Sequence, residues 1–258
     1  MPVITLTTDW NKYDYYVGTV KGKILSRCPG VTIVDISHQV QSFNIAQAAF
    51  ILRNTYTHFP AGTVHMIGVD SLADPVPRHL LIRADDHFFV GADNGVFGLL
   101  FKNDPGHIIE LKGDGRQDIF PMGGALLDAA CRLVNGEKPE TIGTPVDRFN
   151  KRVPMRATIE ESVITGSIIY IDSYQNAIVN ITEELFNRVC KKRNFDIFIQ
   201  SNHYRISALS ATYAERPVGE IVVLFNSLGL MEIGINHGRA AELLNLSTGS
   251  TIRVKFKE

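Results

Sequence analysis

The first 25 residues follow a strand–loop–helix pattern that strongly restricts the fold of this chain. A β-rich apolar run, Val3–Thr8, stops at Asp9, and a second carboxylate, Asp14, precedes a helical pattern of apolar residues at Val17, Val20, Ile24 and Leu25. In open α/β sheets, ligands bind in loops at the carboxyl ends of strands. A carboxylate there can accept two hydrogen bonds from a vicinal diol, which makes Asp9 a candidate binding residue. Asp14 is either a second binding residue or only the N-cap of its helix.

Strands and helices continue to alternate through the first half of the chain. Short apolar runs at residues 31–35 and 63–69 flank a helical pattern whose apolar face is Ile45, Ala48, Ala49 and Leu52. A further helix begins near Phe120, with Gly136 as its expected C-cap. This alternation predicts an N-terminal α/β domain with a mostly parallel sheet flanked by helices.

The third apolar run ends at another carboxylate, Asp70, and a proline-containing loop then leads to Arg78. This pair is either part of a site at the strand end or an ordinary surface ion pair. Residues 80–82 and 88–90 then read as a hairpin about Asp85-Asp86.

The pattern changes after residue 137. Residues 138–154 contain three prolines and several charges with little periodicity, and we interpret them as a linker. Beyond them, apolar residues alternate with period two in short runs at 166–171, 177–181, 195–199, 221–225, 230–235 and 251–256, interrupted by two short helices at 182–192 and 239–244. We therefore predict two domains, an α/β domain over 1–150 and a smaller β-barrel over 151–258, with a sandwich as the other arrangement of the same strands.

Two polar segments lie between strands of the second domain. They are DSYQN at residues 172–176 and NSLG at residues 226–229. Asp, Asn, Ser and Gly are turn formers, so each segment is either a hairpin turn or part of a binding site.

Composition excludes several classes of function. The net charge of −1 gives no nucleic-acid-binding surface, and no apolar run approaches the ~20 residues that cross a bilayer. The start of the chain, MPVITL, lacks the basic region of a signal peptide. The cysteines, Cys28, Cys131 and Cys190, are far apart, which argues against a metal site or disulfides and fits a reducing cytoplasm.

Five segments together resemble one known family. They are TTDWNKYDYYVGTVKGKI, VDISHQVQSFNIAQAA, FPAGTVHMIGVD, IDSYQNAIVNI and NSLGLMEIGINHGRAA, which occur in this order across both domains. The chain is similar to the S-adenosylmethionine hydroxide adenosyltransferases, the relatives of fluorinase and chlorinase. It departs from the family pattern at Asn11, where the family usually has Gly, and at Ala92, which replaces Pro.

The resemblance implies an N-terminal α/β domain and a C-terminal β-barrel assembled as a homotrimer. The substrate, S-adenosylmethionine, would bind between the N-terminal domain of one subunit and the C-terminal domain of the next, with no cofactor. In the first domain, Asp9 would hold the ribose hydroxyls and Asp14 the methionine end. Phe43, where the halogenases have Trp, and Asp70 would line the ribose and the reacting carbon.

The same resemblance assigns five residues of the second domain. Asp172 and Ser227 would bind the methionine amino and carboxylate groups. Asn176 would contact the edge of adenine, together with the backbone around His237, and Tyr213 would stack on adenine.

The resemblance also implies the reaction. In the hydrolases of the family an Asp, an Arg and a His surround the attacking water, and Asp70 and Arg78 match the first two. The position of the His is Gly115, or Asp114 if one inserted residue is allowed, so the His is absent. The expected products are adenosine and methionine. The alternative is a protein that binds S-adenosylmethionine or adenosine with little turnover.

Overall fold

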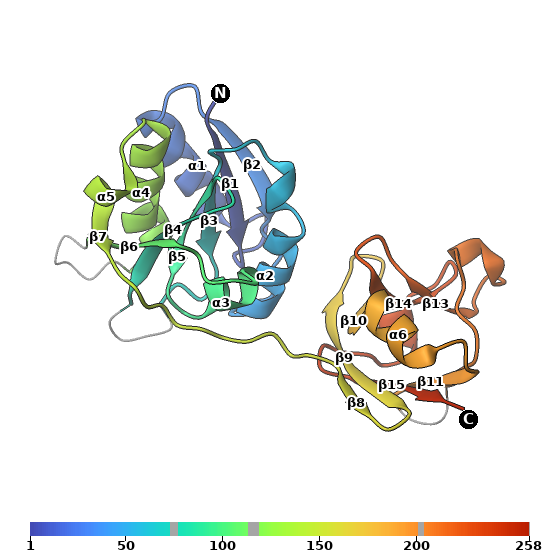
Figure 1. The fold of residues 1–258 in the computed structure, drawn as a ribbon. Coiled ribbons are helices and arrows are strands. Elements are labelled where there is room, and N and C mark those ends of the chain that lie inside the picture. Colours follow the sequence, from blue (N-terminus) through green and yellow to red (C-terminus); the bar gives the residue numbers. More distant parts are fainter. Residues whose placement is uncertain (73–76, 113–118, 201–203, 258) are drawn as a thin grey trace. The chain divides into compact units, whose positions relative to one another are not determined.

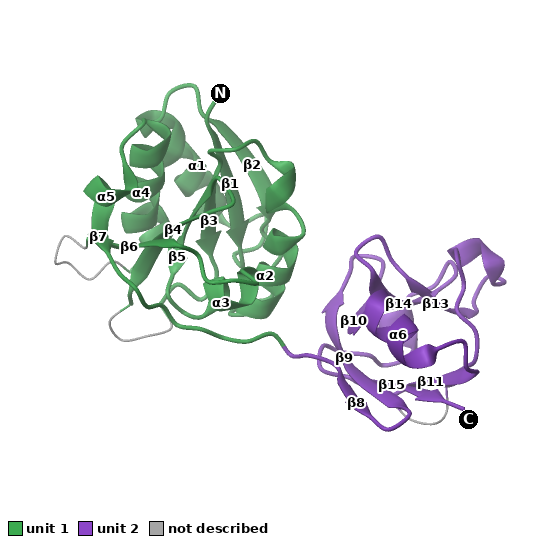
Figure 2. Ribbon diagram, in the orientation of Figure 1, with its two compact units in different colours: residues 1–154 green, residues 155–258 purple. Residues whose placement is uncertain are grey.

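A computed structural model describes residues 1–72, 77–112, 119–200 and 204–257. The chain forms two compact units, residues 1–154 and 155–258 (Figure 2). Each unit contains its own sheet and its own apolar core.

A seven-stranded sheet forms the centre of the first unit, among the residues that the structure describes (Figure 1). In spatial order its strands are β2 (Thr32–Ser37), β1 (Val3–Thr8), β3 (Val64–Gly68), β5 (His87–Ala92), β4 (His79–Ala84), β6 (His107–Leu111) and β7 (Gly143–Pro145). The first four strands in this order pair in parallel, and the remaining pairs are antiparallel. The sheet is therefore mixed, and the expectation of a mostly parallel sheet was wrong for its second half.

The hairpin at Asp85-Asp86 produces this change of direction. Both aspartates have left-handed backbone angles, with φ of 48° and 60°, as tight two-residue hairpin turns require. The predicted hairpin is confirmed. Because only two residues connect β4 to β5, the two strands must run antiparallel. Strand β6 then pairs antiparallel with β4, and β7 pairs antiparallel with β6.

Helices cover both faces of this sheet. Helices α1 (Tyr15–Arg27) and α4 (Ala125–Val134) pack on one face, and α2 (Ile45–Arg53) and α3 (Val96–Leu100) contribute to the core on the other. Side chains along β4 point alternately to the two faces. Leu81 packs in the core beneath α1 and α4, whereas Leu80 and Ile82 pack in the core beneath α2 and α3. Burial on both faces explains why these strands are apolar throughout rather than alternating.

The expected linker over 138–154 was wrong for its first half. Residues 139–145 form a short helix, α5 (Pro139–Ile142), and the edge strand β7, which pairs with β6. An edge strand tolerates Pro145 because one of its sides needs no ladder hydrogen bonds. Pairing with a distant strand, rather than local periodicity, makes this segment regular.

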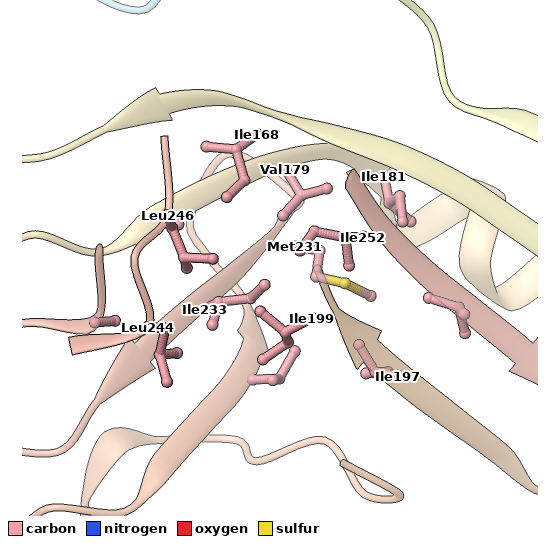
Figure 3. Packing of buried hydrophobic residues seen from close by; sticks show 14 of the residues in the cluster. Ile168, Val179, Ile181, Ile197, Ile199, Met231, Ile233, Leu244, Leu246 and Ile252 are labelled. Carbon is pink, nitrogen blue, oxygen red and sulfur yellow. The ribbon is translucent and has the colours of Figure 1, made fainter. Parts of the chain in front are cut away.

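The second unit is an antiparallel sheet around one apolar core, close to the predicted barrel. Its strands are β8 (Thr158–Glu160), β9 (Val163–Ile171), β10 (Ala177–Thr182), β11 (Phe195–Ile199), β12 (Tyr204–Ile206), β13 (Ile221–Phe225), β14 (Leu230–Ile235) and β15 (Thr251–Phe256). The described strands follow the order β12-β11-β15-β9-β10-β14-β13, with β8 on β9. Figure 3 shows Val179, Ile233 and Ile252, from three of these strands, meeting in the core. All six strands expected from period-two runs are present.

Both short helices of this unit are also present. Helix α6 (Glu183–Cys190) begins after Thr182, whose hydroxyl accepts a hydrogen bond from the amide of Leu185, so the predicted cap is confirmed. Helix α7 (Ala240–Leu243) follows β14. Neither these helices nor any other described helix has the length and apolar character needed to cross a membrane.

Candidate functional site

A cavity of about 740 Å³ lies at the carboxyl ends of β1 and β3. The two strands pair in parallel, with Thr8 opposite Gly68, so the residues that follow them meet at one edge of the sheet. The cavity brings together four predicted site residues, Asp9, Asp14, Phe43 and Asp70. Its lining also includes Trp10, Tyr15, Tyr16, Thr19, Ser42, Ser71, Leu72, Ile119, Phe120 and Met122.

Asp9 is held by a loop from a different part of the chain. Its Oδ2 accepts a hydrogen bond from the amide nitrogen of Phe43 over 2.9 Å. Phe43 has a φ of 66° and an exposed side chain. A bulky residue with a left-handed backbone is strained, and such strain gathers at ligand sites. Asn11, in the Asp9 loop, also has a φ of 71°, which explains how it can occupy a position where the family usually has Gly.

Asp70 also has a left-handed backbone, with a φ of 48°. The buried side-chain amide of Asn94 donates hydrogen bonds to the carbonyl oxygens of Val69 and Asp70, both over 2.9 Å. Asn94 therefore fixes the turn that presents Asp70 at the cavity. An Asn-Gly pair such as Asn94-Gly95 indicates only a local turn, so the sequence gives no signal of the non-local contact between Asn94 and the end of β3.

Asp14 occupies the N-cap position of α1, but its side chain makes no capping hydrogen bond. The interpretation of Asp14 as only a cap therefore lacks the contact that defines a cap. Its carboxylate is part of the cavity lining, where a ligand can reach it.

Three aromatic residues of the cavity lining pack against one another. The ring centroid of Trp10 lies 5.6 Å from that of Tyr16 and 5.4 Å from that of Phe120. Tyr16 and Phe120 are 5.2 Å apart and tilted. Sequence reasoning did not assign Trp10 or Phe120 to the site. An aromatic residue directly after Asp9 was the only available signal, because Phe120 comes from a remote segment.

The described lining of the cavity carries one sign of charge. It contains three carboxylates, Asp9, Asp14 and Asp70, and no Lys, Arg or His. Acidic groups beside aromatic faces attract cations. Among the described residues, no group of three or more His, Cys, Asp or Glu side chains is arranged to hold a metal ion. The carboxylates and aromatic rings of the lining together favour a cation with an apolar or aromatic body.

Arg78 lies outside this described lining. Its Nη1 is 2.9 Å from Asp93 Oδ2, its Nε is 2.7 Å from Glu110 Oε2, and its Nη2 donates to the carbonyl oxygen of Arg148. Asp93 also accepts a hydrogen bond from the amide of Asn150. These contacts hold residues 148–150 at the ends of β4 and β5, so Arg78 has a structural role in addition to its predicted catalytic one. The expected position of the missing His, 114 or 115, lies outside the described residues.

In the second unit, Asp172 organises the turn between β9 and β10. Its Oδ1 accepts hydrogen bonds from the amides of Tyr174 and Asn176, and its Oδ2 accepts one from the Asn176 side chain. Gln175 completes the turn with a φ of 67°. These contacts support the interpretation as a turn, and they also bring together two of the predicted site residues, Asp172 and Asn176.

Tyr213 and the 226–229 turn share one carboxylate. Glu232 accepts hydrogen bonds from the Tyr213 hydroxyl over 2.6 Å and from the Asn226 side chain over 2.9 Å. Burial, followed by the hydrogen bond to Glu232, raises the pKa of the Tyr213 hydroxyl. The Tyr213 ring packs so closely on Gly234 that a Cβ there would lie 2.5 Å from it.

The remaining two predicted residues of this unit lie at its surface. Ser227 is exposed in the turn beside Asn226. His237 is also exposed, just after β14, and has a φ of 54°. Sequence reasoning missed Glu232, because a buried acid inside a strand gives no local signal of its partners.

Two family models match the chain. The SAM hydroxide adenosyltransferase N-terminal domain matches residues 4–143, and the corresponding C-terminal domain matches residues 166–253. An uncharacterized conserved protein from Thermotoga maritima has the same fold, with a TM-score of 0.86 at 23% identity, covering 99% of this chain and 100% of that one.

Curated relatives align along the whole chain. A protein named (R)-S-adenosyl-L-methionine hydrolase from Thermus thermophilus is 26% identical over 98% of this chain and 100% of its own length. One of the same name from Methanocaldococcus jannaschii is 27% identical over 99% of this chain and 97% of its own. A fluorinase from Actinoplanes sp. is 38% identical over 63 residues, 24% of this chain and 21% of the fluorinase.

Proposed function

Because the chain belongs to the SAM hydroxide adenosyltransferase family, we propose that it is an enzyme that hydrolyses S-adenosyl-L-methionine. Water or hydroxide attacks C5′ of the ribose, an oxygen–carbon bond forms, and the bond from C5′ to sulfur breaks. The sulfur leaves with the bonding electron pair, which gives adenosine and L-methionine. The names of the full-length relatives support this reaction.

The acidic, aromatic cavity is the observation that carries the proposal. S-adenosylmethionine has a positive sulfonium and a flat adenine, and the cavity offers Asp9, Asp14 and Asp70 beside three aromatic rings. The same negative charge disfavours a halide as the nucleophile, because the three carboxylates repel an anion that enters the cavity. Water carries no charge and enters without this penalty.

Each acid has a proposed role. Asp9, fixed through Oδ2, presents its other oxygen to the ribose hydroxyls, and Asp14 contacts the methionine end. Phe43 lies along the ribose. Asp70 orients the attacking water beside C5′ and accepts its proton, and Arg78 supports the charge of a developing hydroxide. A positioned base typically accelerates a reaction by ~10²–10⁴-fold.

The leaving group makes no demand for a proton or a cofactor. A sulfonium becomes a neutral thioether when the C5′–S bond breaks. The protein therefore needs only to hold the ribose, the methionine tail and the water in line, and positioning can lower the barrier by several kcal/mol. We propose that no cofactor takes part and that the missing His slows the reaction without abolishing it.

The second domain supplies the rest of the proposed site, as part of a homotrimer. Asp172 and Ser227 bind the amino and carboxylate groups of methionine, Asn176 and the backbone at His237 contact adenine, and Tyr213 stacks on it. These residues come from the neighbouring subunit. The exposed apolar side chains around the first-domain cavity, Tyr15, Phe43, Leu72 and Ile119, support a covering partner. Light scattering tests this arrangement, and a monomer that binds S-adenosylmethionine tightly would contradict it.

One observation favours a second candidate, a binding protein with little turnover. The guanidinium of Arg78 already contacts two carboxylates and a carbonyl oxygen. With the family His also absent, the groups that hold water in the hydrolases would be reduced to Asp70.

Incubation of the purified protein with S-adenosyl-L-methionine separates the two candidates. Chromatography should show adenosine and methionine accumulating in equal amounts, faster than in buffer. Tight binding of S-adenosylmethionine with no adenosine above the buffer background would establish the binding protein instead.

A further inference from the structure

We infer that His38 is a positioning residue that holds the Asp9 loop in its binding conformation, although it lies outside the cavity lining. This inference rests on the proposed role of Asp9 in binding the ribose. It concerns a buried His–Thr contact that the proposed reaction does not use.

The side chain of His38 holds the residue before Asp9. His38 Nδ1 lies 2.7 Å from the hydroxyl oxygen of Thr8, and both side chains are buried. Its main chain holds the other end of the loop, because the carbonyl oxygen of His38 accepts a hydrogen bond from the amide of Asn11 over 2.8 Å. One residue therefore contacts both sides of Asp9 and Trp10.

An acid lies beside the other ring nitrogen of His38. Its Nε2 lies 3.1 Å from Oδ1 of Asp35, and Lys21 pairs with the other oxygen of that carboxylate. Burial would raise the pKa of Asp35, but the contacts with Lys21 and His38 outweigh it and lower that pKa. An ionised carboxylate facing Nε2 favours the ring tautomer that carries its proton on Nε2. Nδ1 then accepts a hydrogen bond from the Thr8 hydroxyl.

The geometry connects this contact to the ligand through Asp9 and Phe43. The Asp9 carboxylate must point at the same time toward the Phe43 amide and into the cavity. The loop includes the left-handed Asn11, whose strain persists only if the surroundings hold it. A loop fixed at Thr8 and Asn11 leaves the Asp9 carboxylate few other directions.

The same strand provides a matched control. Thr5 Oγ1 lies 2.7 Å from Nδ1 of another buried histidine, His65. Thr5→Val and Thr8→Val thus each remove one hydroxyl from one buried Thr–His contact of equal length. Only the Thr8–His38 contact is next to Asp9 in the chain. Thr8→Ser keeps the hydroxyl and serves as the conservative variant.

The experiment measures adenosine affinity by calorimetry at a temperature where circular dichroism shows every variant folded. Loss of one hydrogen bond that orients Asp9 should weaken binding about tenfold in Thr8→Val and in His38→Ala. Thr5→Val should bind as the wild type does, and Thr8→Ser should recover most of the affinity. Equal affinities for Thr8→Val and Thr5→Val would overturn the inference and leave His38 a residue of stability alone.

Amide hydrogen exchange keeps this test independent of the proposed function. Thr8→Val should speed exchange of the Asn11 and Phe43 amides, which bond to His38 and Asp9, while Thr5→Val should not. If the wild type bound no adenosine but this difference appeared, the function would fail and the positioning role would stand. Unchanged exchange in Thr8→Val would overturn the positioning role whether or not adenosine binds.

Discussion

The amide of Phe43 donates to Oδ2 of Asp9, which ties the loop after β1 to the loop before α2. Among the described residues, Oδ1 of Asp9 has no protein partner. One oxygen is thus used to set the geometry of the site, and the other can accept hydrogen bonds from a ligand. The exposed side chain of Phe43 belongs to the same cavity lining as Asp9.

Replacement of Asp9 by Asn tests whether one carboxylate oxygen holds the loop while the other binds the ligand. Asn can still accept from the Phe43 amide, but it loses the charge that strengthens bonds to the ribose hydroxyls. Each such bond contributes roughly 1.5–3 kcal/mol, so adenosine and S-adenosylmethionine should both bind at least about tenfold more weakly. Calorimetry with both ligands measures this. Unchanged adenosine affinity would leave Asp9 a structural residue.

Asp172→Asn should distinguish the two ends of the substrate. The amide oxygen of Asn can still accept from Tyr174 and Asn176, so the turn survives while the charge on the methionine end is lost. S-adenosylmethionine should then bind more weakly and adenosine almost normally. Asp172→Ala, which also removes the turn contacts, should weaken both ligands. If Asp172→Asn reduced both affinities equally, its assignment to the methionine tail would be wrong.

Much of this fold could be predicted because its signals are local. The hairpin at Asp85-Asp86, the cap at Thr182 and six strands of the second unit follow from neighbouring residues. The edge strand β7 could not be predicted, since its regularity comes from pairing with β6. The expectation of a mostly parallel sheet failed although the hairpin was predicted, because the hairpin turns β4 antiparallel to β5 and the distant strand β6 then pairs with β4.

The residues of the candidate site also differ in whether a local sequence signal identifies them. Asp9, Asp14 and Asp70 could be identified because each follows a strand or precedes a helix, and the cavity contains all three. Asn94, Phe120 and Glu232 could not, because their contacts join segments distant in sequence. Arg78 shows the limit most clearly, since its ion pairs with Asp93 and Glu110 have no local signature.

A buried histidine should make the protein less stable in acid. Burial, and to a lesser extent His87, lowers the pKa of His65 from 6.5 to about 3. Below about pH 6.5, His65 therefore binds a proton in the unfolded chain but stays neutral in the folded chain. The contribution of neutral His65 to the free energy of unfolding is fully present above about pH 6.5. It is lost as the pH falls toward 3, by about 1.4 kcal/mol per pH unit.

Denaturant unfolding at several pH values measures this slope. His65→Gln should reduce this slope by up to the contribution of one proton, about 1.4 kcal/mol per pH unit. An equal slope in the wild type and in His65→Gln would show that His65 does not remain neutral in the folded protein.

Asp70→Asn and Arg78→Ala test the proposed catalytic pair. Groups that act mainly in the transition state lower turnover more than ground-state binding. Asp70→Asn should slow single-turnover adenosine formation by ~10²-fold or more, with a smaller change in affinity. Arg78→Ala should slow it as well and also reduce stability, because it frees residues 148–150.

Glu110→Gln is the control for Arg78, since it weakens the same ion-pair network without removing the guanidinium. If Arg78→Ala and Glu110→Gln lost stability alike and both turned over like the wild type, Arg78 would be a structural residue. If Asp70→Asn retained the wild-type rate, another group would hold the water.

The source of the oxygen in adenosine tests the central claim most directly. The protein is incubated with S-adenosyl-L-methionine in water labelled with heavy oxygen, under single-turnover conditions, and the adenosine is analysed by mass spectrometry. We predict that adenosine forms faster than in buffer and carries one labelled oxygen at its 5′-hydroxyl, with methionine unlabelled. Unlabelled adenosine, or no adenosine above the buffer background, would contradict attack by water at C5′.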